Sequence, residues 1–208
     1  QHAVALLEDG TLKAWGSTTA AVTGIPVTTS GVAQVVAGND FTAWIDMDGK
    51  PRVAGGESSG ITIAATSTVV YRSLVAGPTV LLGRTRANGQ WVSIGGTGKA
   101  IPASDGSLLA GLSQVSVGLT HALGLNSSGL SSVIWGDNTY GQTSVPNGLT
   151  GVVAVQAGDA LSVALKSDKT VVAWGGYSSS MPVGLTGVEK IAASARHVLA
   201  LKSNGTVV

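Results

Sequence analysis

Cysteine is absent from the 208-residue sequence, and charged residues make up only 11% of it. The absence of cysteine excludes a disulfide framework and a cysteine-based metal site. Lysine and arginine number 12 against 11 acidic residues and form no cluster, so the chain lacks the basic stripe with which proteins bind nucleic acid. No apolar run approaches the ~20 residues of a membrane-spanning helix. We therefore expect neither nucleic-acid binding nor membrane insertion.

A typical domain is about one quarter charged. The polar surface of this chain must therefore come largely from uncharged residues. Apolar residues still make up 44% of the chain, enough for a sizeable core. A surface rich in hydroxyl residues and glycine, without cysteine, suits an oxidising exterior. We expect an extracellular, cell-surface or virion location.

A turn-forming dipeptide recurs along the chain at intervals of 36 to 40 residues. Most copies end in glycine, which accepts the positive φ angle of a tight hairpin at little cost. The six copies are Asp9-Gly10, Asp48-Gly49, Asn88-Gly89, Ser128-Gly129, Asp168-Lys169 and Asn204-Gly205. This spacing predicts an internal repeat of about 40 residues.

Two further markers keep the same period. Each of the first five turns is followed by a short run ending in glycine, which reads Ala14-Trp15-Gly16, Val53-Ala54-Gly55, Ser93-Ile94-Gly95, Ile134-Trp135-Gly136 and Ala173-Trp174-Gly175. Each turn after the first is preceded by a small-residue run such as Val36-Ala37-Gly38 or Gln156-Ala157-Gly158. Three markers that hold one period exclude a chance match.

One unit, residues 151–186, predicts three short strands: residues 152–157, 161–165 and 170–174. Each run has a normal strand length, the turn signals between them indicate antiparallel pairing, and helical periodicity is absent. A single sheet of this size cannot bury both faces, whereas a ring of stacked sheets can. The sequence therefore predicts an all-β fold, a β-propeller of about six visible blades, each of three to four antiparallel strands.

The first repeat begins just before its second strand and the last ends just before its third. We expect a single β-propeller domain over residues 1–208, truncated within a repeat at both ends and part of a longer chain. A complete six-blade ring would need roughly ten residues before Gln1 and a few tens after Val208.

The unit running from Gly151-Val152 through Ala157-Gly158 and Leu161–Lys166 to Ala173-Trp174-Gly175 resembles the repeat of the regulator of chromosome condensation family. So does the segment Trp135–Gln142 with Val145-Pro146 after it. The resemblance covers essentially the whole chain and is weakest from about residue 51 to 110. It implies a propeller whose relatives include a nuclear exchange factor, a secreted bacterial inhibitor of β-lactamase, and domains of large surface and phage proteins. The short, even repeats are most similar to those of the inhibitor.

Residues of types that could catalyse a reaction or bind a metal are better explained by their positions in the repeat. His2, His121 and His197 occupy equivalent positions in three blades, which are usually too far apart to share an ion, so we expect each to fix a neighbouring loop by a hydrogen bond. The tryptophans are interpreted as packing residues. The segment 56–60 matches G-x-S-x-G but lacks the following helix that a nucleophile elbow needs. Segments 46–49 and 95–100 are likewise interpreted as a hairpin turn and a loop rather than calcium and phosphate sites.

We therefore expect no enzyme, cofactor or metal, and a non-enzymatic interaction or structural module of a larger surface or virion protein, such as a phage tail or fibre component. Its partner would be a protein or a glycan, bound through propeller loops, and the chain would be a subunit of a larger assembly. The exposed candidates for binding are Asp137, Asn138, Tyr140, Gln142 and Tyr177. The alternative is a secreted protein inhibitor of an extracellular enzyme such as a β-lactamase.

Overall fold

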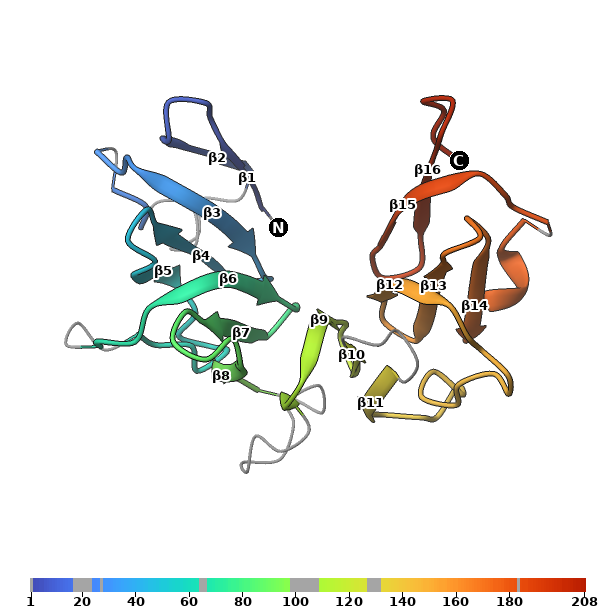
Figure 1. Ribbon diagram of the computed structural model, residues 1–208. Coiled ribbons are helices and arrows are strands. Elements are labelled where there is room, and N and C mark those ends of the chain that lie inside the picture. The colour runs from blue at the N-terminus through green and yellow to red at the C-terminus, as the bar shows by residue number, and fades with distance from the viewer. Residues whose placement is uncertain are drawn as a thin grey trace. The chain divides into compact units, whose positions relative to one another are not determined.

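The computed structural model describes residues 2–16, 24–26, 28–63, 67–97, 109–126, 132–182 and 184–208. Within these residues the chain forms six antiparallel sheets, one after another along the sequence (Figure 1). Four sheets have three strands and two have two strands, so the predicted all-β propeller architecture with about six blades is confirmed. The two sheets with two strands, β1–β2 and β15–β16, belong to the first and last repeats, for which the sequence predicts incomplete blades.

The strands are short, as the turn spacing predicts. In the first three sheets they are β1 (His2–Leu6), β2 (Leu12–Gly16), β3 (Val32–Ala37), β4 (Phe41–Asp46), β5 (Pro51–Gly55), β6 (Tyr71–Ala76), β7 (Val80–Thr85) and β8 (Trp91–Gly96). In the last three they are β9 (Leu112–Val117), β10 (His121–Asn126), β11 (Ser132–Gly136), β12 (Val152–Ala157), β13 (Leu161–Lys166), β14 (Val171–Gly175), β15 (Val188–Ala193) and β16 (Val198–Lys202). A 3₁₀ turn, η2 (Ser178–Ser180), follows β14.

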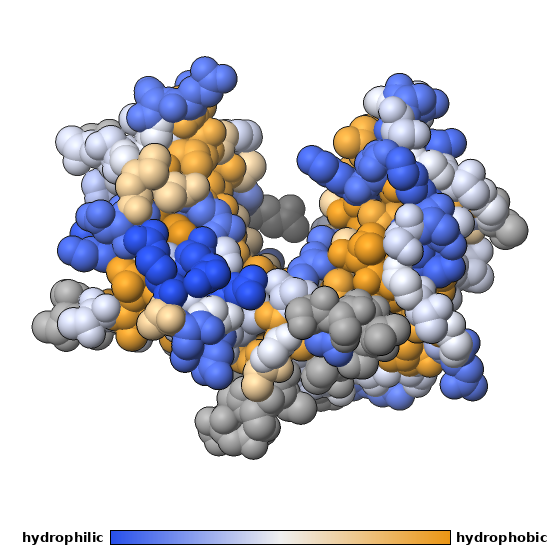
Figure 2. Space-filling view, viewed as in Figure 1, coloured by the Kyte–Doolittle hydropathy of each residue, from blue (hydrophilic) through white to orange (hydrophobic). Residues whose placement is uncertain are grey.

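The chain divides into two units, residues 1–98 and 99–208, each holding three sheets. In the first unit β3 packs against both β1 and β6, and in the second β12 packs against both β10 and β15. Consecutive sheets of a unit therefore stack on one another and bury the faces that a lone sheet would expose. Figure 2 shows apolar side chains over the strands of each unit and polar side chains on hairpin turns at its upper rim.

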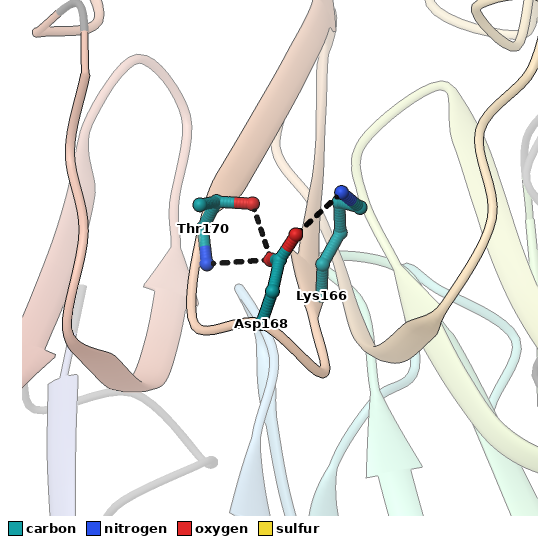
Figure 3. A network of polar contacts seen from close by, with 3 residues as sticks. All are labelled: Lys166, Asp168 and Thr170. Carbon is teal, nitrogen blue, oxygen red and sulfur yellow. Dashed lines mark hydrogen bonds and ion pairs between the residues drawn. The ribbon is translucent and has the colours of Figure 1, made fainter.

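Several of the described hairpin turns are closed by a side chain. In the turn between β13 and β14, the Asp168 carboxylate accepts hydrogen bonds from the main-chain N–H of Thr170 at 3.0 Å and from its hydroxyl at 2.5 Å (Figure 3). Its other oxygen accepts one from Lys166 Nζ at 2.8 Å. These bonds to the charged form, above all the one from Lys166, lower the pKa of Asp168 from 3.8 to about 2. Asp9 and Asn204 close their own turns in the same way.

Main-chain hydrogen bonds join three of the described hairpin turns to the next sheet. The carbonyl oxygens of Gly10, Gly49 and Lys169 accept from the N–H of Val32, Tyr71 and Val188, at 2.8 to 3.0 Å. The donor in each case is the first residue of the next sheet's first strand. The hairpin turn of one repeat therefore contacts the first strand of the next repeat.

Side chains add a second set of links at the same period. The side-chain amide of Gln34 donates to the Leu74 oxygen at 3.0 Å, and its oxygen accepts from the Leu74 N–H at 2.8 Å. Gln114 bridges to Val155 in the same two ways in the second unit. A partly buried glutamine thus supplies both the donor and the acceptor that an open strand edge lacks.

Four of the five tryptophans pack as predicted, and one does not. Trp44, Trp91, Trp135 and Trp174 are each less than 10% exposed, whereas Trp15 is 55% exposed. Trp174 shares a core cluster with Leu123 and Leu125 of the preceding sheet. Trp15 belongs to the first sheet, and no described residue covers it in that way. The prediction that Trp15 is a packing residue is therefore wrong for this structure.

Candidate functional site

The loop after β11 is held by its own side chains. The Asp137 carboxylate accepts hydrogen bonds from the hydroxyl of Thr139 and from the side-chain amide of Gln142, both at 3.0 Å. The side-chain oxygen of Asn138 accepts one from the main-chain N–H of Thr143 at 2.9 Å. Asp137 and Asn138 therefore fix the conformation of the loop that carries Tyr140.

Gln142 lies inside the protein, with none of its surface exposed. Its side-chain oxygen accepts from the N–H of Tyr140 at 2.9 Å. Its main-chain oxygen accepts from the Ser162 hydroxyl at 2.7 Å and from the Trp174 indole at 3.0 Å. The expectation that Gln142 is exposed for a partner is wrong, because its polar atoms satisfy buried groups of its own loop and of the next sheet.

Two exposed tyrosines lie on loops that join successive sheets. Tyr140, on the loop after β11, is 66% exposed, and Tyr177, on the loop after β14, is 46% exposed. The loops meet at Gly176, where a Cβ atom would lie 3.4 Å from the Cβ of Tyr140. Tyr177 adopts a left-handed conformation, φ 65°, at the start of η2.

An arginine from a third loop joins this pair. The guanidinium of Arg196, between β15 and β16, lies 5.3 Å from the centre of the Tyr177 ring, a distance at which cation and ring attract. Arg196 forms no ion pair with any described residue. We call Tyr140, Tyr177 and Arg196 the loop face. Sequence reasoning missed Arg196, although it replaces the uncharged Thr120 and Ala160 at its repeat position.

The histidines act within the repeat and are not brought together. His121 Nε2 lies 2.9 Å from the Ser162 hydroxyl, and His2 Nε2 lies 2.7 Å from the Thr42 hydroxyl, each in the next sheet. These two histidines make the predicted kind of hydrogen bond, but to a strand of the next sheet rather than to a loop, whereas His197 is exposed. Burial lowers the pKa of His121 below 6.5, against an opposing effect of nearby carboxylates. No group of three metal-ligating side chains occurs among the described residues.

The remaining motifs have structural explanations where they are described. In the segment 56–60, Ser58 and Ser59 donate hydrogen bonds to the Asp40 carboxylate from a turn. The segment follows strand β5, and the described residues directly after it, 61–63, form no helix. Asp46 accepts from the Lys50 N–H at 2.9 Å and closes the hairpin as predicted. The segment 95–100 ends outside the described residues. None of the described helices is long and apolar enough to span a membrane.

Solved structures show the same fold over nearly the whole chain. The ectodomain of the receptor kinase CR4 of Physcomitrella patens matches with a TM-score of 0.76 at 20% identity, covering 98% of this chain and 58% of that one. The CRINKLY ectodomain of the Arabidopsis thaliana receptor kinase ACR4 matches with a TM-score of 0.74 at 16% identity, covering 97% and 72%. Yeast RCC1 (Prp20), in a structure with Kap60, matches with a TM-score of 0.75 at 14% identity, covering 99% and 67%.

These matches establish an RCC1-like β-propeller fold, as the repeat resemblance predicts. No family model and no curated protein matches the sequence. The chain spans 58% of the length of the CR4 ectodomain. At these identities the likeness concerns the fold, so function has to be argued from the surface of this chain.

Proposed function

We propose that this RCC1-like propeller chain is a non-enzymatic interaction module that binds a partner protein through the loop face. The observation that carries the proposal is that the loops of the exposed Tyr140 and Tyr177 meet at Gly176, with Arg196 over the ring of Tyr177. Tyrosine and arginine are the residue types most enriched among binding hot spots. A tyrosine offers a large contact area for the loss of few rotatable bonds.

The loop face is also held ready for binding. Asp137 and Gln142 fix the loop that carries Tyr140, and Arg196 stacks on Tyr177. A preformed surface loses less conformational entropy when a partner binds. Asp137 and Asn138 support binding through this loop conformation, and Tyr140 and Tyr177 make the contact. Exposed tyrosine rings also suit a glycan, which is the second partner class that the proposal includes.

The proposed location is extracellular, on a cell surface or virion, with the chain as one module of a larger assembly. The lack of cysteine and the low charge support this location. Two of the similar structures are ectodomains of receptor kinases. Protease treatment of intact source cells or particles tests the location: digestion of the chain while internal proteins survive supports it, and protection until lysis overturns it.

Binding is tested with labelled chain on arrays of purified surface proteins and of glycans. The test variant combines Tyr140→Ala, Tyr177→Ala and Arg196→Ala, and the matched control is Val153→Ala, an exposed apolar residue away from the loop face. We expect the control to keep the ligands of the unmodified chain and the triple variant to lose them at least tenfold. Ligands bound equally by the triple variant, or none bound above background by the unmodified chain, would overturn the proposal.

A further inference from the structure

A cavity of about 270 Å³ lies beside strands β4 and β5 of the first unit (Figure 1). Its walls come from these two strands and from the loop that precedes β3. The polar lining residues are Thr28, Thr29, Ser30, Asp46 and Arg52, and Trp44 supplies an aromatic wall. Pockets of this size are near the lower end of the range for small-molecule sites, so the cavity suits a ligand of a single ring.

Two of the lining residues face each other across the sheet and differ from their counterparts in later sheets. Trp44 on β4 lies opposite Arg52 on β5. In the next three sheets the same two positions hold a glycine or alanine opposite a valine. These pairs are Gly83 and Val92, Gly124 and Val133, and Ala164 and Val172. A large aromatic residue and a cation therefore replace two smaller, uncharged residues at this cavity.

Thr29, on the loop before β3, also departs from the repeat. It lies two residues before Gly31, and two residues before the equivalent glycines stand Leu109, Leu149 and Leu185. Thr29 keeps the turn of this loop, because its N–H donates a hydrogen bond to the Pro26 oxygen at 2.9 Å. Leu149 makes the same bond to Pro146 at 3.2 Å. The backbone of the repeat is thus kept, while an apolar side chain that packs in other sheets becomes a hydroxyl.

Packing accounts for the tryptophan but not for the two polar replacements. Trp44 shares a core cluster with Ala54, as Trp174 shares one with Ala164. The large and the small residue have exchanged strands between the two sheets, which keeps the core filled. No such exchange accounts for Arg52, which is exposed and forms no ion pair with any described residue. Its guanidinium is therefore available to a ligand in the cavity.

The lining favours an uncharged ligand that both donates and accepts hydrogen bonds. Arg52 and Asp46 bring one charge of each sign and do not pair with each other, so a charged ligand is attracted by one and repelled by the other. A sugar hydroxyl can accept from the guanidinium and donate to the carboxylate, and the hydroxyls of residues 28–30 can do either. Trp44 is 6% exposed, and this part of its indole offers an apolar surface to the C–H groups of a sugar ring.

We propose that this cavity binds one uncharged hexose ring. Arg52, Asp46 and the hydroxyls of residues 28–30 hydrogen-bond its hydroxyl groups, and Trp44 contacts its apolar face. The site is separate from the loop face, because it lies in the first unit and the loop face lies in the second. It adds a sugar-binding activity to the proposed interaction with a protein.

The probes are D-glucose, D-galactose and D-mannose, with glycerol at the same hydroxyl concentration as the ligand control. Binding is measured by NMR on isotope-labelled chain, from the shift of the Trp44 indole N–H signal, which is assigned by its loss in Trp44→Phe. We expect at least one hexose to shift this signal saturably, with a Kd of about 1–10 mM for a ligand of about 12 non-hydrogen atoms. The corresponding uronic acid should bind no more tightly, because its gain at Arg52 is offset at Asp46.

Protein variants locate the site. Arg52→Val and Thr29→Leu restore the residues of other sheets and should each weaken binding at least fivefold, whereas Lys13→Val, the matched change at the position of Arg52 in the first sheet, should leave it unchanged. Thermal unfolding confirms that the variants fold. Tyr140→Ala should also leave binding unchanged, which separates this site from the loop face. No saturable shift with any of the three hexoses, an equal shift with glycerol, tighter binding of the uronic acid, or undiminished binding by Arg52→Val would overturn the proposal.

Discussion

The indole Nε1 of Trp174 donates a hydrogen bond to the main-chain oxygen of Gln142, 3.0 Å away in the preceding repeat. The two residues are 32 positions apart in the sequence. Both are buried, and the same oxygen also accepts from Ser162. One sheet is thus joined to the next by a tryptophan and by the loop that carries Tyr140.

Trp174→Ala is expected to lower the free energy of unfolding by about 3–5 kcal/mol, because it removes a buried aromatic side chain and leaves a cavity. Trp15→Ala, at the same repeat position, should cost less than about 1 kcal/mol, because Trp15 is 55% exposed. Urea unfolding of both variants gives the comparison. Equal losses would contradict the assignment of Trp174 as the link between sheets.

Gln142→Met keeps the side-chain volume and removes the polar groups of the buried glutamine side chain. We expect a loss of about 1–3 kcal/mol, because the Tyr140 N–H and the Asp137 carboxylate lose a buried partner. Hydrogen exchange at the Tyr140 amide should become faster, which isolates the loop from a general loss of stability. An unchanged exchange rate would show that another group holds the loop.

Gly49→Ala and Gly205→Ala compare two hairpin glycines at the same repeat position. Both have positive φ, +82° and +83°, so alanine costs about 1–2 kcal/mol at either site. At Gly49 the new Cβ would also lie 2.4 Å from the Tyr71 oxygen of the next sheet, whereas nothing lies within 4 Å of it at Gly205. Chemical denaturation should show a clearly larger loss for Gly49→Ala, and a larger loss for Gly205→Ala would contradict this packing.

The stability of the chain should fall as the pH drops below 6.5. Burial lowers the pKa of His121, so the unfolded chain binds a proton that the folded chain does not. The stabilisation is fully present above pH 6.5 and is lost as the pH falls through the folded-state pKa. Urea unfolding from about pH 8 to about pH 5 measures the slope.

His121→Gln should reduce that slope. A slope of the same sign remains from His2, whose pKa burial also lowers. The free energy of unfolding of the variant should therefore vary less with pH than that of the unmodified chain. An identical slope in the two proteins would exclude His121 as the source.

The fold was accessible from the sequence because its signals are local. The segment 151–186 predicts strands at residues 152–157, 161–165 and 170–174, and the structure has β12, β13 and β14 at Val152–Ala157, Leu161–Lys166 and Val171–Gly175. Strand alternation and turn glycines act on neighbouring residues. Even Lys169, which replaces glycine in its turn, adopts the positive φ, 63°, that the hairpin needs.

Which side chains are exposed could be predicted only in part from the sequence, because exposure depends on which sheet covers a side chain. Tyr140 and Tyr177 are exposed as expected, whereas Gln142, in the same loop as Tyr140, is buried beneath the Trp174 sheet. Trp15 and Trp174 have the same repeat position and opposite exposure. Arg196 contacts Tyr177 from a different loop, and no spacing in the sequence indicates this contact. Local patterns thus specify the strands and turns, and burial and the loop face arise from packing between repeats about 40 residues apart.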